Sequence, residues 1–216
     1  MRVSSSNHRL ATAGLVLAAL FTTACGNVAR SGRGPSYLII EALEGASGAD
    51  PGTFGTTVSS DVVTIVEQDI NGTTVRVPTV YGDPGRVTFR LGLKDPGPAT
   101  GTATAPGPLN DVTVNRYRVA YKRADGRNTQ GVDVPYAFDG AFTVTVRGTG
   151  SAEAGFDLVR IAAKVESPLV NLSRNGGAQF IGTIADITFY GRDQAGNEVS
   201  VTGSMSVSFA DYGDPQ

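Results

Sequence analysis

The stretch of residues 199–209 alternates strictly between two kinds of side chain. Its odd positions are apolar or glycine, and its even positions from 200 to 208 are all serine or threonine. A repeat of two is the period of a β-strand, and it places one face of the strand in a core and the other in water. Gly203 interrupts the apolar series, which predicts either a bulge or a close approach of another segment.

Other stretches rich in β-branched and aromatic residues predict further strands. These are residues 37–42, 62–67, 73–80, 87–93, 112–123, 132–137, 142–147, 156–165 and 180–190. Turn sequences containing Asn-Gly, Asp-Gly or Asp-Pro-Gly separate them. No stretch has a convincing 3.6-residue period, so any helix should be a single turn. The pattern predicts an all-β fold, an antiparallel β-sandwich of about 8–10 strands or a barrel.

The first 24 residues have the layout of a secretory signal peptide. Arg2 and Arg9 are basic, residues 10–21 are almost entirely apolar, and small residues precede Cys25. The apolar core is shorter than the roughly 20 residues that cross a bilayer, and no later segment comes close to that length. We therefore expect export and cleavage of residues 1–24.

The sequence Thr22-Thr23-Ala24-Cys25 resembles the lipobox of bacterial lipoproteins, although Leu is commoner than Thr at its first position. The resemblance implies that Cys25 is lipidated, and a diacylated cysteine anchors a protein stably. It also implies the bacterial cell envelope, at the outer membrane or the periplasmic face, with the membrane as a partner. An ordinary signal peptide and an uncleaved anchor are the alternatives. Residues 26–36 are small, polar and Gly-rich, which predicts a flexible tether.

Cleavage would remove the chain's only histidine, His8, and lipidation would block its only cysteine. The remaining 192 residues carry 16 basic and 20 acidic side chains, hence a formal charge of −4. Without imidazole or free thiol, the mature chain lacks the usual nucleophile–base pairs and His-ligated metal sites. A hydrolase based on two carboxylates is an alternative that this composition leaves open. The acidic balance argues against a nucleic-acid partner.

Residues 94–111 are rich in Pro, Gly, Ala and Thr and do not have the composition of a core segment. They predict either a long loop within one domain or a linker between two. Only 58 residues, 36–93, precede this stretch. That length is short for an independent sandwich, so we favour one β-sandwich domain over residues 37–216.

Two stretches resemble bacterial immunoglobulin-like and fibronectin type III-like modules. Residues 116–126 resemble a third strand with its following turn. Residues 188–199 resemble a hairpin that carries an Asp-x-x-Gly-Asn turn, here from Asp193 to Asn197. The resemblance implies an immunoglobulin-like sandwich with an interaction or scaffolding role, by analogy of fold.

Calcium is the most plausible ion, because it prefers oxygen ligands from Asp, Asn and backbone carbonyls. Two groups of residues have this composition: Asp125, Asn128, Asp133 and Asp139, and then Asp193, Asn197 and Glu198. Neither has the spacing of an EF-hand, and Asp and Asn also stabilise turns without any ion. We therefore expect no obligatory cofactor, with calcium as the alternative.

Aromatic side chains beside turns are candidate platforms for sugar rings. Tyr81, Tyr136 and Tyr212 each lie beside Gly or Pro, and the chain has no Trp. Arg116, Arg118 and Lys122 share one face of a predicted strand, whose other face is apolar. The sequence favours a non-catalytic binding, adhesion or scaffolding role with a protein or glycan partner. A carbohydrate-binding or carboxylate-based hydrolytic envelope protein is the alternative.

Overall fold

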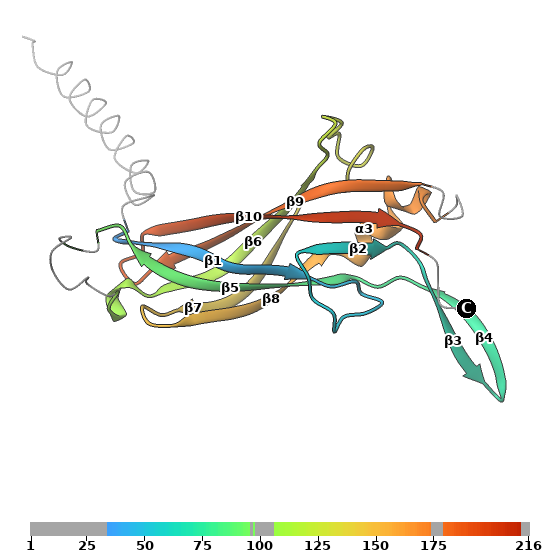
Figure 1. The fold of residues 1–216 in the computed structure, drawn as a ribbon, viewed down its shortest axis with the longest axis horizontal. Helices are drawn as coiled ribbons and strands as arrows, with labels where there is room; N and C mark the ends of the chain where they lie inside the picture. The colour runs from blue at the N-terminus through green and yellow to red at the C-terminus, as the bar shows by residue number, and fades with distance from the viewer. Residues whose placement is uncertain (1–33, 96, 98–105, 174–178, 213–216) are drawn as a thin grey trace, which may run out of the picture.

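The computed structural model describes residues 34–95, 97, 106–173 and 179–212, and their fold is almost entirely β (Figure 1). The predicted signal peptide, lipobox and most of the tether lie outside the described residues. The strands are β1 (Ser36–Gly45), β2 (Thr57–Asp61), β3 (Thr64–Ile70), β4 (Thr73–Thr79), β5 (Asp83–Leu93), β6 (Val112–Lys122), β7 (Phe138–Val146), β8 (Ser151–Val159), β9 (Phe180–Asp193) and β10 (Glu198–Ala210). Three short helical elements accompany them: η1 (Pro108–Asn110), α3 (Ile161–Val165) and η2 (Leu169–Asn171). The prediction of an all-β fold is confirmed, and the helices within the described residues are short, as expected.

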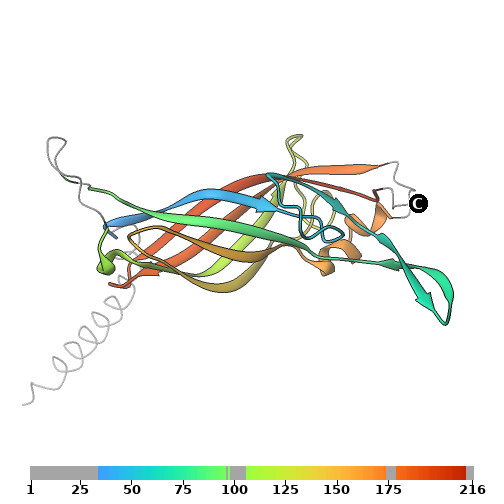
Figure 2. The ribbon, with the colours of Figure 1, turned by 60° about the horizontal axis from the view of Figure 1, so that its bottom comes forward.

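Two sheets pack face to face as an elongated sandwich (Figure 2). One sheet has the strand order β1-β5-β8, and the other has the order β2-β10-β9-β6-β7. Their pairings are antiparallel except for β2, which runs parallel to β10. Between the sheets, the rings of Phe89 and Phe189 meet edge to face at 5.0 Å, and both residues are fully buried. Such a contact adds about 0.5–1.5 kcal/mol to the free energy of burying the rings.

The alternation along β10 confirms its predicted faces. Met205, Val207 and Phe209 are buried, whereas the Ser and Thr residues between 200 and 206 are exposed. At Gly203 a Cβ atom would lie 2.8 Å from Leu43 Cδ2 of β1, and the pairing of β9 with β10 shows no shift in register there. Gly203 therefore marks a close approach of β1 and not a bulge.

Strands from both sides of residues 94–111 pair with one another. β5 pairs with β8, and β2 pairs with β10, so both sheets contain strands from before and after this stretch. Of the stretch itself, residues 96 and 98–105 lie outside the described residues, and 108–110 form η1. Both stretches that resemble immunoglobulin-like modules adopt the expected local structure, namely β6 with its turn and the β9–β10 hairpin.

Two predicted strands are wrong in part. Residues 132–137 form a loop with an isolated bridge at Val134, because the adjacent Pro135 has no N–H to donate to a ladder. Residues 161–165 form α3, because Ala162, Ala163 and Lys164 favour a helical turn once β8 has ended. β2 was not predicted, since its polar sequence has no apolar alternation.

β3 and β4 form a separate two-stranded sheet that projects beyond the sandwich (Figure 1). Asn71 and Gly72 join them with φ values of 55° and 80°, as a two-residue hairpin turn requires. Among the described helices, none is long and apolar enough to span a membrane.

Candidate binding groove

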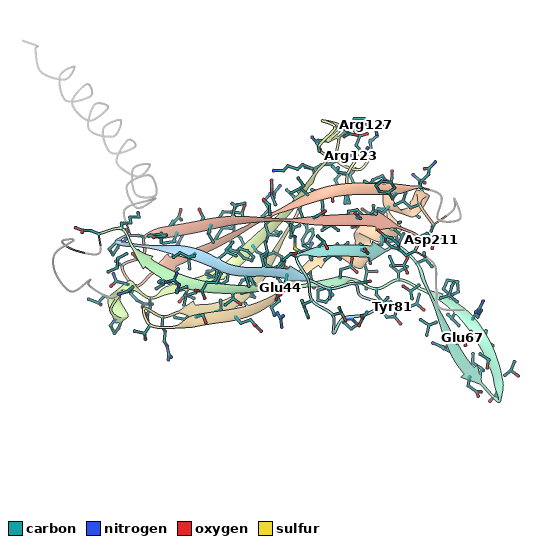
Figure 3. The ribbon with its side chains drawn as sticks, viewed as in Figure 1. Glu44, Glu67, Tyr81, Arg123, Arg127 and Asp211 are labelled. Carbon is teal, nitrogen blue, oxygen red and sulfur yellow. The ribbon has the colours of Figure 1, made fainter. Side chains whose placement is uncertain are left out.

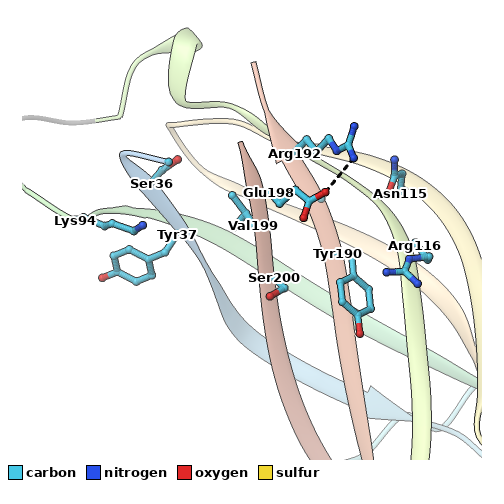
Figure 4. Close-up of a pocket in the computed structure, with 12 residues that line it drawn as sticks. Ser36, Tyr37, Lys94, Asn115, Arg116, Tyr190, Arg192, Glu198, Val199 and Ser200 are labelled. Atoms are coloured by element: carbon cyan, nitrogen blue, oxygen red, sulfur yellow. Dashed lines mark hydrogen bonds and ion pairs between the residues drawn. The ribbon is translucent and has the colours of Figure 1, made fainter. Parts of the chain in front are cut away.

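A groove lies at the end of the sandwich where β1 begins (Figure 4). Because β2 pairs only with residues 206–210 of β10, the first half of β10 has no partner strand on that side, and β1 of the other sheet lies against it. The cavity between them measures about 560 Å³, within the size range of small-molecule sites. Its walls come from β1, β6, β9, β10 and the residue that follows β5.

A β-bulge in β6 supplies one wall of the groove. Val114 pairs with Gly191 and Arg116 with Tyr190, so Asn115 is an extra residue. Asn115 and Arg116 are therefore both exposed on the outer face, although they are adjacent in the chain. A bulge re-aims side chains in this way.

Aromatic rings lie on opposite sides of the groove. The guanidinium carbon of Arg116 lies 4.0 Å from the ring centroid of Tyr190, a cation–π contact. The ring of Tyr37 lies over Gly92, where a Cβ atom would come within 2.6 Å of it, and 44% of Tyr37 is exposed. Both rings are thus held in place while the groove between them remains open.

The charges that line the groove are mostly positive. They are Lys94, Arg116 and Arg192 against a single carboxylate, Glu198, which gives a formal charge of +2 for the lining residues. Arg192 Nη2 lies 3.0 Å from Glu198 Oε1, so this pair neutralises itself (Figure 4). Arg116 also pairs with Asp139, at 3.4 Å, outside the lining. The formal surplus of positive charge among the lining residues suits an anionic ligand, since a concave surface focuses the field of its charges.

The residues of the first group of calcium candidates each form hydrogen bonds or ion pairs with other residues, and not with one another. Asp125 binds Arg123 at 2.6 Å and Arg127 at 3.1 Å, and Figure 3 shows both arginines on the loop after β6. The hydrogen bond from Arg123 is the main cause that lowers the pKa of Asp125. Asn128 accepts the backbone N–H of Arg123 at 2.6 Å. The two remaining members bind elsewhere: Asp133 accepts the N–H of Thr129, and Asp139 pairs with Arg116 and Arg118.

The second group is a closed turn. Asp193 Oδ1 accepts the backbone N–H groups of Ala195 and Asn197, and Oδ2 accepts the Asn197 side-chain amide at 2.7 Å. Glu198 pairs with Arg192. Among the described residues, no three His, Cys, Asp or Glu side chains gather as a metal site. Calcium binding stays a prediction, and a melting temperature that shifts with calcium and EDTA would support it.

The three predicted tyrosines lie apart from the groove. Tyr81 precedes β5 and contacts the backbone near Gly48, where a Cβ atom would lie 2.6 Å from Tyr81 Cβ. Tyr136 lines a smaller cavity of about 170 Å³ beside α3. Tyr212 follows β10, and its backbone N–H donates to Asp61.

Sequence reasoning missed Tyr37 and Tyr190 as candidates. Tyr37 precedes the core residue Leu38, and Tyr190 follows the core residue Phe189. Because side chains alternate along a strand, both tyrosine rings lie on the outer face. An outward tyrosine on a strand was the available signal. Which outward tyrosines share a groove depends on how the two sheets meet, and the sequence does not contain that information directly.

Comparison with protein-family models, with curated proteins and with solved structures finds no match for this chain. The likenesses to lipoproteins and to immunoglobulin-like modules accordingly stay predictions.

Proposed function

We propose that this protein is a lipid-anchored, non-catalytic binding protein of the bacterial cell envelope, and that the groove takes an anionic glycan. The observation that carries the proposal is the groove's composition: two tyrosine rings, and a lining with three cationic side chains and one carboxylate, in a cavity of about 560 Å³. Tyrosine rings suit the faces of sugar rings, and the cations suit carboxylate or phosphate substituents.

The position of the groove supports a ligand close to the membrane. Gly34 lines the groove, and it follows Cys25 by only nine residues. Nine residues span at most about 30 Å even when fully extended. Lipidation at Cys25 would thus hold the mouth of the groove near the membrane surface, among the glycans of the envelope.

A binding role fits this groove better than hydrolysis. Glycoside hydrolysis uses two carboxylates, and only Glu198 among the described lining residues has one. Glu198 is already paired with Arg192 at 3.0 Å. The groove thus offers cations and rings for recognition but no second carboxylate for acid–base chemistry.

The test compares glycan binding by the detergent-solubilised full chain and by single variants. On an array of neutral and acidic glycans, we expect acidic glycans to bind. Arg116→Ala should weaken that binding at least about tenfold, since a lost charge-assisted hydrogen bond costs about 1.5–3 kcal/mol. Tyr190→Ala should weaken it as well, because it removes one ring of the groove and the cation–π contact that holds Arg116. Binding should also weaken as salt is raised.

Two matched substitutions serve as controls. Arg76→Ala removes an arginine that pairs with Glu67 on the projecting hairpin, and Tyr136→Ala removes an exposed tyrosine beside α3. Neither should change binding. Loss of binding in Tyr136→Ala alone would move the site to the cavity beside α3 and overturn the groove assignment. Capture of an envelope protein without any glycan signal would replace the glycan with a protein partner.

A further inference from the structure

A lysine and an aspartate are buried together at the end of the sandwich away from the groove. Lys164 Nζ lies 2.8 Å from Asp83 Oδ1, and the two side chains are only 1% and 0% exposed. Removing both charges from water costs free energy. Their mutual attraction offsets that cost only if the geometry is good and every remaining polar atom has a hydrogen-bond partner. Whether this pair is favourable as two ions therefore depends on the hydrogen-bond partners of its remaining polar atoms.

One oxygen of this pair has no partner. Lys164 Nζ also donates to the backbone oxygen of Asp61 at 2.7 Å, and Asp83 Oδ1 also accepts the N–H of Gly48 at 2.7 Å. Asp83 Oδ2 is buried and has no hydrogen bond among the described residues. An unsatisfied carboxylate oxygen in a core is rare and calls for an explanation.

The fold brings these groups together from distant parts of the chain. Asp83 begins β5, where the pairing with β8 shifts in register, and Lys164 lies on α3, 81 residues later. The flanking valines are buried too: Val159, which pairs with Asp83, and Val62, next to Asp61, are each 1% exposed. The amine and the carboxyl group are thus fixed against each other, and neither side chain is exposed to solvent.

We propose that Lys164 and Asp83 condense to form an intramolecular amide bond between Nζ and Cγ. The Nζ–Cγ bond forms and the Cγ–Oδ2 bond breaks. Starting from ammonium and carboxylate, two of the three Nζ protons leave with Oδ2 as one water molecule, and the third stays as the amide N–H. The step needs no oxidant, reductant or other reactant.

The hydrogen-bond partners match the product better than the ion pair. An amide has one N–H and one oxygen, and the Asp61 backbone oxygen and the Gly48 N–H are available to bind them. The unpartnered Oδ2 is the atom that leaves. Condensation would also remove both buried charges, whose desolvation is the main cost of the pair.

The same contacts favour the reaction. The Gly48 N–H points at Asp83 Oδ1, where negative charge develops when Nζ attacks Cγ. Fixing two reactants at contact distance gives effective concentrations of up to about 10⁵–10⁸ M in well-oriented systems. Pro84 follows Asp83 and has no N–H, so the competing ring closure of aspartate onto the next backbone nitrogen is blocked.

Mass spectrometry of the denatured full chain tests the proposal. We expect the chain to be lighter than its Lys164→Arg variant by one water molecule, after allowance for the substitution itself. Trypsin should then fail to cut after Lys164. The digest should contain residues 77–86 joined to residues 161–174 as one species, in place of separate peptides 77–86, 161–164 and 165–174.

Two variants sharpen the outcome. Lys164→Arg keeps the charge but should yield no joined peptide. Asp83→Asn should yield a joined peptide of the same mass as the wild type, because an amide loses ammonia where the acid loses water. Separate peptides from the folded wild type would overturn the proposal, and the ion pair would then be structural only. Loss of water that maps to Asp125-Gly126 or Asp139-Gly140 would also overturn it.

Discussion

At the scale of single residues, two tyrosines of β6 tie the sheets together. Tyr121 donates its hydroxyl to the backbone oxygen of Leu158 in β8 at 2.6 Å, and the hydroxyl of Tyr117 accepts the N–H of Asp157 at 3.0 Å. Both rings are buried among the phenylalanines of the core, including Phe156 and Phe209. Burial is the main cause that raises the pKa of both phenols above the usual 10.0.

Tyr121→Phe should destabilise the protein at neutral pH by about 1–3 kcal/mol, because the buried Leu158 oxygen loses its donor. The raised pKa of Tyr121 also predicts a pH dependence. Above pH 10.0 the phenol of Tyr121 releases its proton in the unfolded state and keeps it in the folded state. Raising the pH therefore stabilises the unfolded state relative to the folded one. This contribution to stability is present below pH 10.0 and falls above it, by at most about 1.4 kcal/mol per pH unit for one group.

Urea unfolding followed at neutral pH and at about pH 11 measures both effects. The wild type should lose more free energy of unfolding over that interval than Tyr121→Phe does. Parallel pH profiles for the two proteins would show that the Tyr121 phenol contributes nothing to the alkaline loss.

At the scale of elements, the β3–β4 hairpin differs from every other strand pair. Its two strands pair only with each other, and from Glu67 to Arg76 every residue is exposed (Figure 3 marks Glu67). An isolated hairpin is at best marginally stable in water. Its Asn-Gly turn and the Arg76–Glu67 pair, 3.1 Å apart, keep the strands in register. The hairpin therefore adds little to the stability of the sandwich.

Replacement of residues 67–76 by Asn-Gly should leave the melting temperature within about 2 °C of the wild-type value. Val66 and Val77 face each other across the hairpin, and both have a backbone N–H, so a two-residue turn can join them. Thermal unfolding followed by circular dichroism makes the measurement. Glycan binding should also survive, because the groove lies at the other end of the sandwich. A drop of many degrees would mean that the hairpin packs against the sandwich.

At the scale of the whole molecule, the sandwich has two different ends. The groove and the start of β1 lie at one end, and the hairpin and the buried Lys164–Asp83 pair lie toward the other (Figure 1). If Cys25 is lipidated, the groove end faces the membrane and the hairpin points away from it. A covalent link between Lys164 and Asp83 would close a loop that includes β5 to β8, and this would limit how far the chain can unravel from its anchor.

Cys25→Ser tests the anchor. We expect the variant to keep its leader, and so to run larger than the mature protein, and to lose its acyl chains. Metabolic labelling with a fatty acid and gel mobility measure both properties. An unchanged size together with an unchanged membrane fraction would refute lipidation at Cys25.

Much of the fold could be predicted from the sequence, because it depends on residues that are close together in the chain. Alternation along residues 199–209 predicted the faces of β10, and Asn71-Gly72 predicted a turn, because period and turn geometry depend on neighbouring residues. The β9–β10 hairpin followed from its Asp193–Asn197 turn in the same way. Two strand predictions failed: residues 132–137 form a loop, and residues 161–165 form the helical turn α3. Apolar content alone does not separate a strand from a loop or a helix over five or six residues.

Long-range contacts decided the rest. The groove lies along the part of β10 that does not pair with β2, and it gathers Tyr37, Arg116 and Tyr190 from three strands. The Lys164–Asp83 pair joins residues 81 positions apart. In the sequence Lys164 is an ordinary lysine and Asp83 an ordinary turn residue. Burial in the core, which depends on the packing of the whole chain, is what makes them a reactive pair.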